Sequence, residues 1–164
     1  MKNNLLVIFL LCTIFTNAQV DNDPKFWDNV HFGGGFGLGF GSNQTIISIS
    51  PSAIYEFNDL FALGLGGSYL YAKNGNLKSN VYGASIISLF NLLEEIQLSA
   101  EFEQLFVTQR QFGFDNNNFD YPALYLGAAY RVGWFAAGVR FDVLYDDNKS
   151  IYTSPFSPLV RFYF

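Results

Sequence analysis

The chain is poor in cysteine, in histidine and in charge, and each shortage excludes a class of function. Its 164 residues include one cysteine, Cys12, and one histidine, His31. Without a second thiol or imidazole, the chain can form neither an internal disulfide nor a familiar zinc site. Only 14% of the residues are charged, whereas a soluble domain has about 25%. The surface is therefore expected to be unusually apolar.

The basic residues argue against nucleic acid as a partner. The nine Lys and Arg are scattered, no two of them are adjacent, and the formal net charge is −5. Proteins neutralise phosphate backbones with clustered Lys and Arg. We therefore expect no nucleic acid partner, and no residue pattern calls for a metal or another cofactor.

Long apolar runs are also missing, although 50% of the residues are hydrophobic and 19% are aromatic. Beyond the first residues, no stretch reaches the roughly 18 uninterrupted apolar residues that a spanning helix needs. The apolar residues instead alternate with small or polar ones, as in a membrane strand. The length allows one domain.

The first residues have the pattern of a secretory signal peptide. Lys2 supplies a positive charge, and Leu5–Phe15 form an eleven-residue apolar core that is too short for a stable anchor. A small residue, Ala18, then offers a cleavage site. We predict cleavage after Ala18 and export by the Sec route.

A lipoprotein signal at Cys12 is the alternative, and it is disfavoured. Leu10 and Leu11 stand before this cysteine, where lipidation sites need small residues. The predicted organisation is a signal peptide over residues 1–18, a polar periplasmic lead-in over 19–28 and a β-barrel over 29–164.

From Val30 onward, apolar residues recur at every second position, which is the period of a β-strand. In the first run, Phe32, Phe36 and Leu38 face one side and glycines occupy the other. Each run has about the 9–11 residues with which a tilted strand crosses a bilayer. The eight runs cover residues 30–40, 47–57, 61–71, 80–90, 96–106, 122–132, 135–145 and 155–164. The phase of the fourth run is ambiguous, and Pro51 predicts a bulge or an irregular edge in the second.

The connections alternate between short and long, as they do in outer-membrane barrels. The short ones lie at Asn58-Asp59, at residues 91–95 and at Gly133, and the longer, polar ones at residues 73–79, 110–120 and 146–153. The link over residues 42–45 is an exception, because it is short where a long loop is expected. These patterns predict an all-β fold, namely a transmembrane antiparallel up-and-down barrel of about eight strands in a bacterial outer membrane. Both termini would lie in the periplasm. A soluble lipocalin-like barrel would need a water-facing polar surface, but the second face here is mainly Gly, Ser and Ala.

The charged residues of the less apolar face are predicted to point into the lumen. They are Glu56, Glu101, Glu103, Arg131, Arg140, Asp142 and Arg161. Charges in a confined core persist when they are paired and hydrogen-bonded. We expect a central network around Glu101, Glu103, Arg140 and Asp142. A salt-bridged plug is favoured over a narrow ion path, because eight strands enclose too little volume for a water-filled pore.

Aromatic residues mark both the last strand and one end of the barrel. Phe156, Val160, Phe162 and Phe164 recur at period two up to the final residue. Such an ending resembles the signal that the barrel assembly machinery of outer membranes recognises, with an unpaired strand edge as a route to docking. A second aromatic set is predicted to form an interfacial girdle, and it comprises Trp27, Phe57, Phe61 and Trp134.

The glycine ladder over residues 33–41 and His31 invite catalytic interpretations that the sequence does not favour. The ladder has neither a dinucleotide-binding spacing nor a G-K-[ST] sequence, so we expect it to make room for large side chains of the opposite wall. His31 could belong to a lipid-modifying hydrolase. It begins the first strand at the periplasmic end, however, so a structural hydrogen bond is the better interpretation.

The whole chain resembles the small eight-stranded outer-membrane barrels of the OmpA/OmpX type. More narrowly, the N-A-Q cleavage region followed by FWDNVHFGGGFGLGFG and ISPSAIYEFND is similar to a family of short barrels from Bacteroidetes. The resemblance implies fold and location rather than activity. Similar chains sometimes carry the label α-ketoglutarate decarboxylase, which these residues do not support, because the large thiamine-diphosphate enzymes with that activity need a cofactor site this length cannot house.

Three functions follow from the sequence, in order of preference. The first is a structural or surface-binding barrel without catalysis, with a filled lumen. Its partners would be outer-membrane lipid and lipopolysaccharide, the barrel assembly machinery and an extracellular ligand at the loops. The second is a narrow porin-like pore, and the third is a membrane-embedded lipid-modifying enzyme.

Overall fold

The computed structural model describes residues 24–41, 44–111, 116–147, 149–152 and 154–164. The predicted signal peptide, its cleavage site and Cys12 lie outside the described residues. Within the predicted lead-in, Pro24–Asp28 form a short helix, α2. No helix among the described residues is long and apolar enough to cross a membrane.

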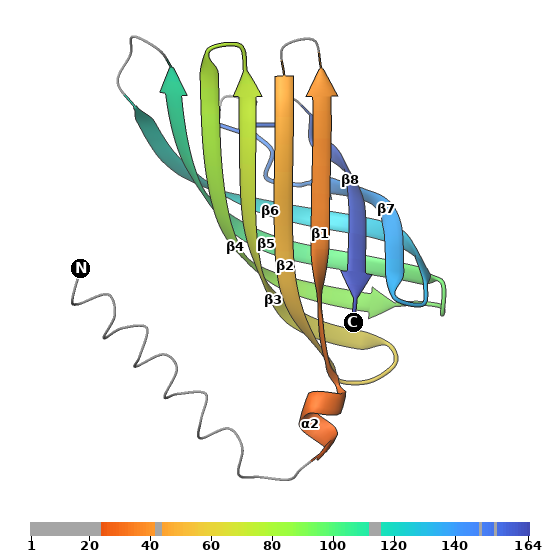
Figure 1. Ribbon diagram of the computed structural model, residues 1–164. Coiled ribbons are helices and arrows are strands. Elements are labelled where there is room, and N and C mark those ends of the chain that lie inside the picture. Colours follow the sequence, from red (N-terminus) through yellow and green to blue (C-terminus); the bar gives the residue numbers. More distant parts are fainter. Residues whose placement is uncertain (1–23, 42–43, 112–115, 148, 153) are drawn as a thin grey trace, which may run out of the picture.

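Eight antiparallel strands close into one barrel in sequence order, which confirms the predicted all-β up-and-down architecture (Figure 1). Every strand pairs with its neighbours in the chain, and β8 returns to β1. The strands are β1 Val30–Gly41, β2 Gln44–Glu56, β3 Phe61–Asn74, β4 Leu77–Asn91, β5 Ile96–Gln111, β6 Asn117–Val132, β7 Phe135–Asp142 and β8 Phe156–Tyr163.

The alternating sequence places small and polar side chains inside and large apolar side chains outside. Because successive residues of a strand face opposite sides of the sheet, burial alternates along the strands, as in β4 and β6. The structure settles the ambiguous phase of β4, where Val81 and Ile87 point inward while Tyr82 and Ile86 are more than half exposed outside.

Parts of two predicted loops are strand, so these boundaries were wrong. β3 and β4 continue to a two-residue turn, Gly75-Asn76, in place of the predicted loop over 73–79. β5 and β6 likewise extend to Gln111 and from Asn117, inside the predicted loop over 110–120. In both cases pairing with the neighbouring strand outweighs the polar composition, which had suggested loop. β7 in turn ends at Asp142 rather than at residue 145.

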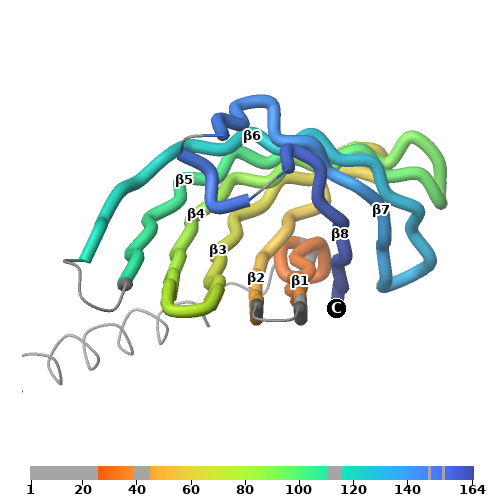
Figure 2. The backbone as a smooth tube through the Cα atoms, turned by 90° about the horizontal axis from the view of Figure 1, so that it is seen from above, coloured from red at the N-terminus to blue at the C-terminus, as the bar shows by residue number. Residues whose placement is uncertain are grey.

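The barrel has two different ends, which we call the base and the mouth. The base carries α2, Phe164 and the turns over residues 57–60, 92–95 and 133–134. The mouth carries the other connections (Figure 1). β7 and β8 have eight residues each, whereas β3 to β6 have 14 to 16. The wall is therefore tall on one side and low on the other, and the long segment 143–155 folds back across the mouth (Figure 2).

The closure between β1 and β8 is the shortest ladder of the barrel. Two residue pairs join these strands, Gly33 with Tyr163 and Gly34 with Phe162, and Phe32 and Phe164 add two backbone hydrogen bonds at the base. Every other neighbouring pair shares at least seven residue pairs. The irregularity predicted at Pro51 is a break on the β3 side, because neither Ser50 nor Pro51 pairs with β3.

Two apolar clusters fill the barrel above and below its polar middle. The base cluster contains Ile54, Ala62, Ile87, Leu89, Ala129, Ala136, Leu159 and Tyr163. The mouth cluster contains Leu70, Val81, Leu105, Val107, Tyr121, Ala123 and Tyr125. Along β5, Glu101 and Glu103 separate the base-side residues from Leu105 and Val107. The charged residues therefore lie in the central layer.

Two hairpin turns, at Gly75 and Gly133, depend on a backbone conformation that favours glycine. Both glycines have φ near +60° at the first position of a two-residue hairpin loop, which favours glycine. We expect Gly133→Ala to lower the free energy of unfolding by about 1–2 kcal/mol, since no atom within 4 Å would meet the new methyl group and the cost is conformational. Urea titration in detergent micelles measures it. Gly67→Ala, which adds a methyl where the nearest atom is 3.9 Å away and φ is ordinary, should change stability by less than about 0.5 kcal/mol. Equal effects of the two substitutions would contradict this account of the turn.

Candidate functional site in the barrel interior

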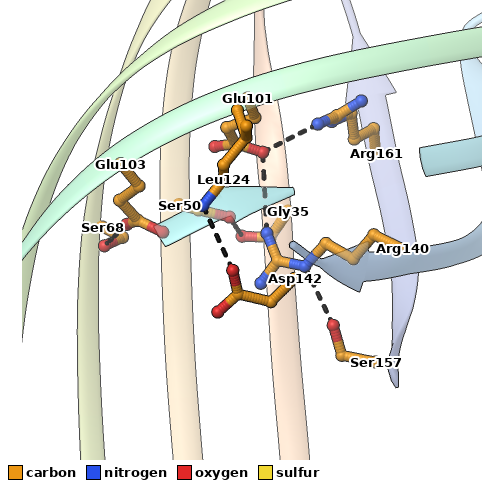
Figure 3. Close-up of polar contacts among 10 residues, drawn as sticks. All are labelled: Gly35, Ser50, Ser68, Glu101, Glu103, Leu124, Arg140, Asp142, Ser157 and Arg161. Atoms are coloured by element: carbon orange, nitrogen blue, oxygen red, sulfur yellow. Dashed lines mark hydrogen bonds and ion pairs between the residues drawn. The ribbon is translucent and has the colours of Figure 1, made fainter. Parts of the chain in front are cut away.

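Three charged side chains from three strands meet at the centre of the barrel. Glu101 of β5 receives Arg161 of β8 and Arg140 of β7 on the same carboxylate oxygen, Oε2, at 2.9 and 3.5 Å (Figure 3). The side chains of Glu101 and Arg161 are about one-tenth exposed, and that of Arg140 is 21% exposed. One carboxylate therefore links β5 to both strands of the low wall.

Arg140 makes the largest number of contacts in this layer. Besides Glu101, its Nε donates to Ser157 Oγ at 3.0 Å, and its guanidinium carbon lies 4.0 Å from the centre of the Tyr125 ring. A cation over an aromatic face is stabilised by the ring quadrupole, more so when water is excluded. Arg140 is thus held by β5, β6 and β8 together.

The other two central acids, Glu103 and Asp142, are satisfied by neutral donors. The hydroxyl of Ser68 donates to Glu103 Oε1. Asp142 Oδ1 accepts the backbone N–H groups of Leu124 and Leu144 at 3.2 and 3.0 Å. Asp142 therefore ties the end of β7 to β6, as Figure 3 shows for Leu124. Neither carboxylate lies within 4 Å of a basic group in the part of the chain that the structure describes.

The remaining two predicted lumen charges lie at the base, away from the central layer. Glu56 pairs with His31, Oε2 to Nε2, at 3.3 Å, and both side chains are about one-third exposed. Arg131 donates from Nε to the carbonyl of Gly133 at 3.2 Å and lies over the Tyr163 ring. The seven charges predicted for the lumen thus form a central group of five and two separate contacts at the base.

A buried polar chain at the base was not foreseen from the sequence. Tyr163 donates its hydroxyl to Gln97 at 2.7 Å, and Gln97 donates to Asn91 at 2.9 Å. Asn91 in turn donates to the carbonyl of Asp59 at 3.2 Å. The alternation indicated that Gln97 and Tyr163 point inward, but Asn91 had been assigned to the predicted turn over residues 91–95, whereas it is the last residue of β4. This chain joins β8, β5 and β4 across the base.

The segment 143–155 occupies the mouth of the barrel. Ile151 and Tyr152 pack against the mouth cluster, the N–H of Ile151 donates to the Tyr121 hydroxyl at 3.3 Å, and Tyr145 donates to the carbonyl of Tyr152 at 3.1 Å. Burial raises the pKa of Tyr152 to about 12, so this phenol is neutral near pH 7. The segment adds a plug of main chain to the side chains of the lumen.

A cavity of about 160 Å³ lies between the charged layer and the wall of β1 to β3. On that wall it is lined by glycines and serines, among them Gly35, Gly37, Ser48 and Ser50, and on the other side by Glu101 and Arg140. The glycine ladder of β1 therefore faces the large side chains of the opposite wall. Among the described residues, no group of three or more His, Cys, Asp or Glu could hold a metal ion.

The aromatic residues predicted for the girdle all lie at the base, in two separate groups of contacting rings. In the first group, Phe57 contacts Phe61 at 5.8 Å between ring centroids, and Phe61 contacts Phe90 at 6.4 Å. Phe26 of α2 joins Trp27 to Tyr55, which contacts Phe57. In the second group, Trp134 stacks on Phe162 and Phe164, at 5.6 and 6.0 Å. Sequence reasoning missed Phe26, Tyr55 and Phe90 as members of the first group.

The residues of the predicted assembly signal point outward along β8. Phe156 is 65% exposed and Phe164 is 77% exposed, while Phe162 stacks on Phe36 of β1. Phe119 of β6 stacks on Tyr121 and packs against the mouth cluster.

The shared carboxylate of Glu101 predicts a large loss of stability when its charge is removed. Glu101→Gln leaves two buried guanidinium groups without an ionic partner, so the free energy of unfolding should fall by about 3–5 kcal/mol. Urea unfolding, followed by heat-modifiable migration on gels, measures this change. Glu94→Gln makes the same substitution in an exposed turn of the base and should have almost no effect. A Glu101→Gln barrel as stable as the Glu94→Gln control would show that the central pairs contribute little.

Comparison with known proteins gives no relative on which to base a function. No family model, no curated protein and no solved structure matches the chain. The fold and the geometry of the interior are therefore the grounds on which a function is proposed.

Proposed function

We propose that the chain is an outer-membrane β-barrel with a plugged lumen, which acts as a structural or surface-binding protein rather than as an enzyme. The observation that carries the proposal is the distribution of polarity, which is the reverse of that of a soluble barrel. Large apolar side chains lie exposed on the outside, and the charges lie within. The outward set includes Phe32, Phe36, Leu38, Ile47, Ile49, Leu65, Tyr82, Ile86, Phe102, Phe106, Leu126, Val139 and Phe156.

An apolar surface of this extent is expected to be covered by an apolar partner, and the height of the apolar band matches that of a bilayer. A soluble monomer rarely exposes a contiguous apolar patch of more than a few hundred Å². The outward residues of β3 run from Phe61 to Tyr71, ten steps apart. At about 3.4 Å per residue and a tilt of about 40°, they span ~25 Å along the barrel axis. This is the height of the apolar band of outer-membrane barrels.

Aromatic side chains border this band at both ends, as in membrane barrels. The base has two groups of rings, one around Phe57 and Phe61 and the other around Trp134. Towards the mouth, Tyr69 contacts Tyr82 with ring centroids 5.1 Å apart. We propose that the base faces the periplasm and that the mouth faces the exterior.

Fractionation tests the location directly. We expect the protein in the outer-membrane fraction, with heat-modifiable migration and co-flotation with phospholipid vesicles. A folded, monodisperse protein that stays in solution without detergent and does not float would contradict the proposal.

A charge on the outer face tests the orientation of the side chains. Leu65 is 67% exposed in the middle of the band, and Leu60 is 55% exposed in a turn of the base. We expect Leu65→Arg to lower the free energy of unfolding in vesicles by about 2–4 kcal/mol, because the cost of a charge is greatest at the bilayer midplane. Leu60→Arg should cost less than about 1 kcal/mol, because it lies near the interface. Equal losses of unfolding free energy for the two variants would contradict a position of Leu65 inside the bilayer.

A narrow pore is the second candidate, and the cavity beside Arg140 is the observation that favours it. Planar-bilayer recording separates the two functions. We expect no stable channel steps from the unmodified barrel. The double substitution Ile151→Gly and Tyr152→Gly, which loosens the segment in the mouth, should produce them. Lys149→Gly with Ser154→Gly, at exposed positions of the same segment, is the matched control. Stable, ion-selective channel steps from the unmodified barrel would contradict the plugged lumen and favour a pore.

The third candidate, a lipid-modifying enzyme, rests on His31. This residue lies at the base in contact with Glu56, which we propose to be the periplasmic end. Acyl release from lipid A or phospholipid by the purified barrel, lost in His31→Ala, would favour an enzyme over a structural barrel.

A further inference from the structure

The cavity beside the charged layer lies against the two strands that close the barrel. Its lining includes the inward residues Glu101 and Arg140 and, on the closing strands, Phe36, Pro158 and Val160. The backbones of β1 and β8 therefore form the part of the wall that separates this side of the cavity from the apolar outer face.

The backbone limits how far the ladder between β1 and β8 can extend. Phe164 exchanges backbone hydrogen bonds with Phe32, whereas Tyr163 donates to Trp134 beside β7. Because the direction alternates along an antiparallel strand, the backbone groups at every second residue before Phe164 also face β1. Pro158 occupies such a position, and proline has no N–H to donate.

The ladder to β1 stops at Gly34 and Phe162 and does not resume towards the mouth. The pairing break beside Pro51 is different, because the ladder between β2 and β3 resumes on both sides of it. The seam between β1 and β8, by which we mean the unpaired stretch from Phe36 and Val160 towards the mouth, is therefore the place where the wall can part.

The groups that line the cavity favour a head group with oxygen acceptors. Among the three central ion-paired side chains, Arg140 is the most exposed, at 21% against 11% for Glu101 and 9% for Arg161. Arg161 lines the same cavity and keeps one donor, Nη1, buried without a partner among the described residues. The acids are less available, since Glu101 is shared by both arginines and Glu103 accepts from Ser68.

The outer rim of the seam is apolar. Phe36 is 60% exposed and stacks on Phe162 at 5.8 Å between ring centroids, and Phe156 is 65% exposed. A cavity of about 150 Å³ holds a molecule the size of benzene. The space of about 160 Å³ is therefore enough for a small head group and a few methylenes, with the rest of the chain outside.

We propose that this cavity binds a single-chain amphiphile with an oxygen-acceptor head group, of which a fatty acid is the simplest, and that the ligand enters sideways through the seam between β1 and β8. The head group contacts Arg140 and the serines of β2, and the tail lies along Phe36 and Val160. The inference rests on the proposed membrane location, because the tail must remain in an apolar phase.

Native mass spectrometry of the folded barrel, released from non-ionic detergent, tests the proposal with dodecanoate, dodecanol and dodecylammonium as probes. We expect one dodecanoate per barrel. Dodecylammonium should bind about tenfold more weakly or worse, because it cannot accept the charged hydrogen bond from Arg140. Tighter binding of dodecylammonium than of dodecanoate would overturn the assignment of the head group.

Two pairs of variants test the cavity and the seam separately. Ser48→Val fills the cavity and should weaken dodecanoate binding about tenfold, while Ala84→Val on the outer face of β4 should not. Pro158→Val restores an N–H towards β1 and should weaken binding about fivefold, by one backbone hydrogen bond. Pro122→Val, the same change on β6 away from the seam, should leave binding unchanged.

Vesicle flotation and dodecanoate binding together distinguish the ligand site from the membrane location. A barrel that floats with vesicles and shows heat-modifiable migration, but binds no more dodecanoate than Ser48→Val does, overturns the ligand site alone. Equal binding by the Pro158→Val and Pro122→Val variants overturns the route through the seam. A protein that does not float overturns the membrane location, whatever it binds.

Discussion

The interior of the barrel depends on one carboxylate, that of Glu101, which receives Arg161 and Arg140 on a single oxygen. Taking charges out of water is costly unless they are paired and hydrogen-bonded. The surrounding groups meet that condition through Ser157 and the ring of Tyr125 at Arg140. Because Arg140 and Arg161 come from the two shortest strands, these contacts hold the low wall of β7 and β8 to the long strand β5.

The unequal height of the wall explains how the mouth is filled. β7 ends where Asp142 turns to accept the N–H groups of Leu124 and Leu144. The chain then needs residues 143–155 to reach β8, and their apolar members, Ile151 and Tyr152, pack against the mouth cluster. The plug is therefore a consequence of the length of β7. The seam is not, because β8 continues from Arg161 back to Phe156 beyond its last residue pair with β1.

The prolines mark the places where the sheet does not continue. Pro51 coincides with the break between β2 and β3, and Pro158 faces β1 within the unpaired stretch beyond Phe162, where the closing ladder ends. Pro122 stands on β6 beyond the residues that pair with β7. A proline removes a ladder hydrogen bond and is tolerated at edges and irregular sites. The Pro51 irregularity was predictable from the sequence, whereas the other two sites depend on which neighbour each strand has.

The amino-acid sequence by itself determined the number of strands, the inner and outer faces of all but the fourth, and the set of inward charges, because a period of two assigns each side chain to a face. It did not determine where the strands end, since the polar residues 73–74, 77–79, 110–111 and 117–120 become strand only by pairing with neighbours. Nor did it determine which charges meet. Glu101 and Arg161 are sixty residues apart, and Glu56 and Arg131 share their phase but lie at the base. Register and strand length set the height of each side chain in the barrel, and only the closed barrel fixes both.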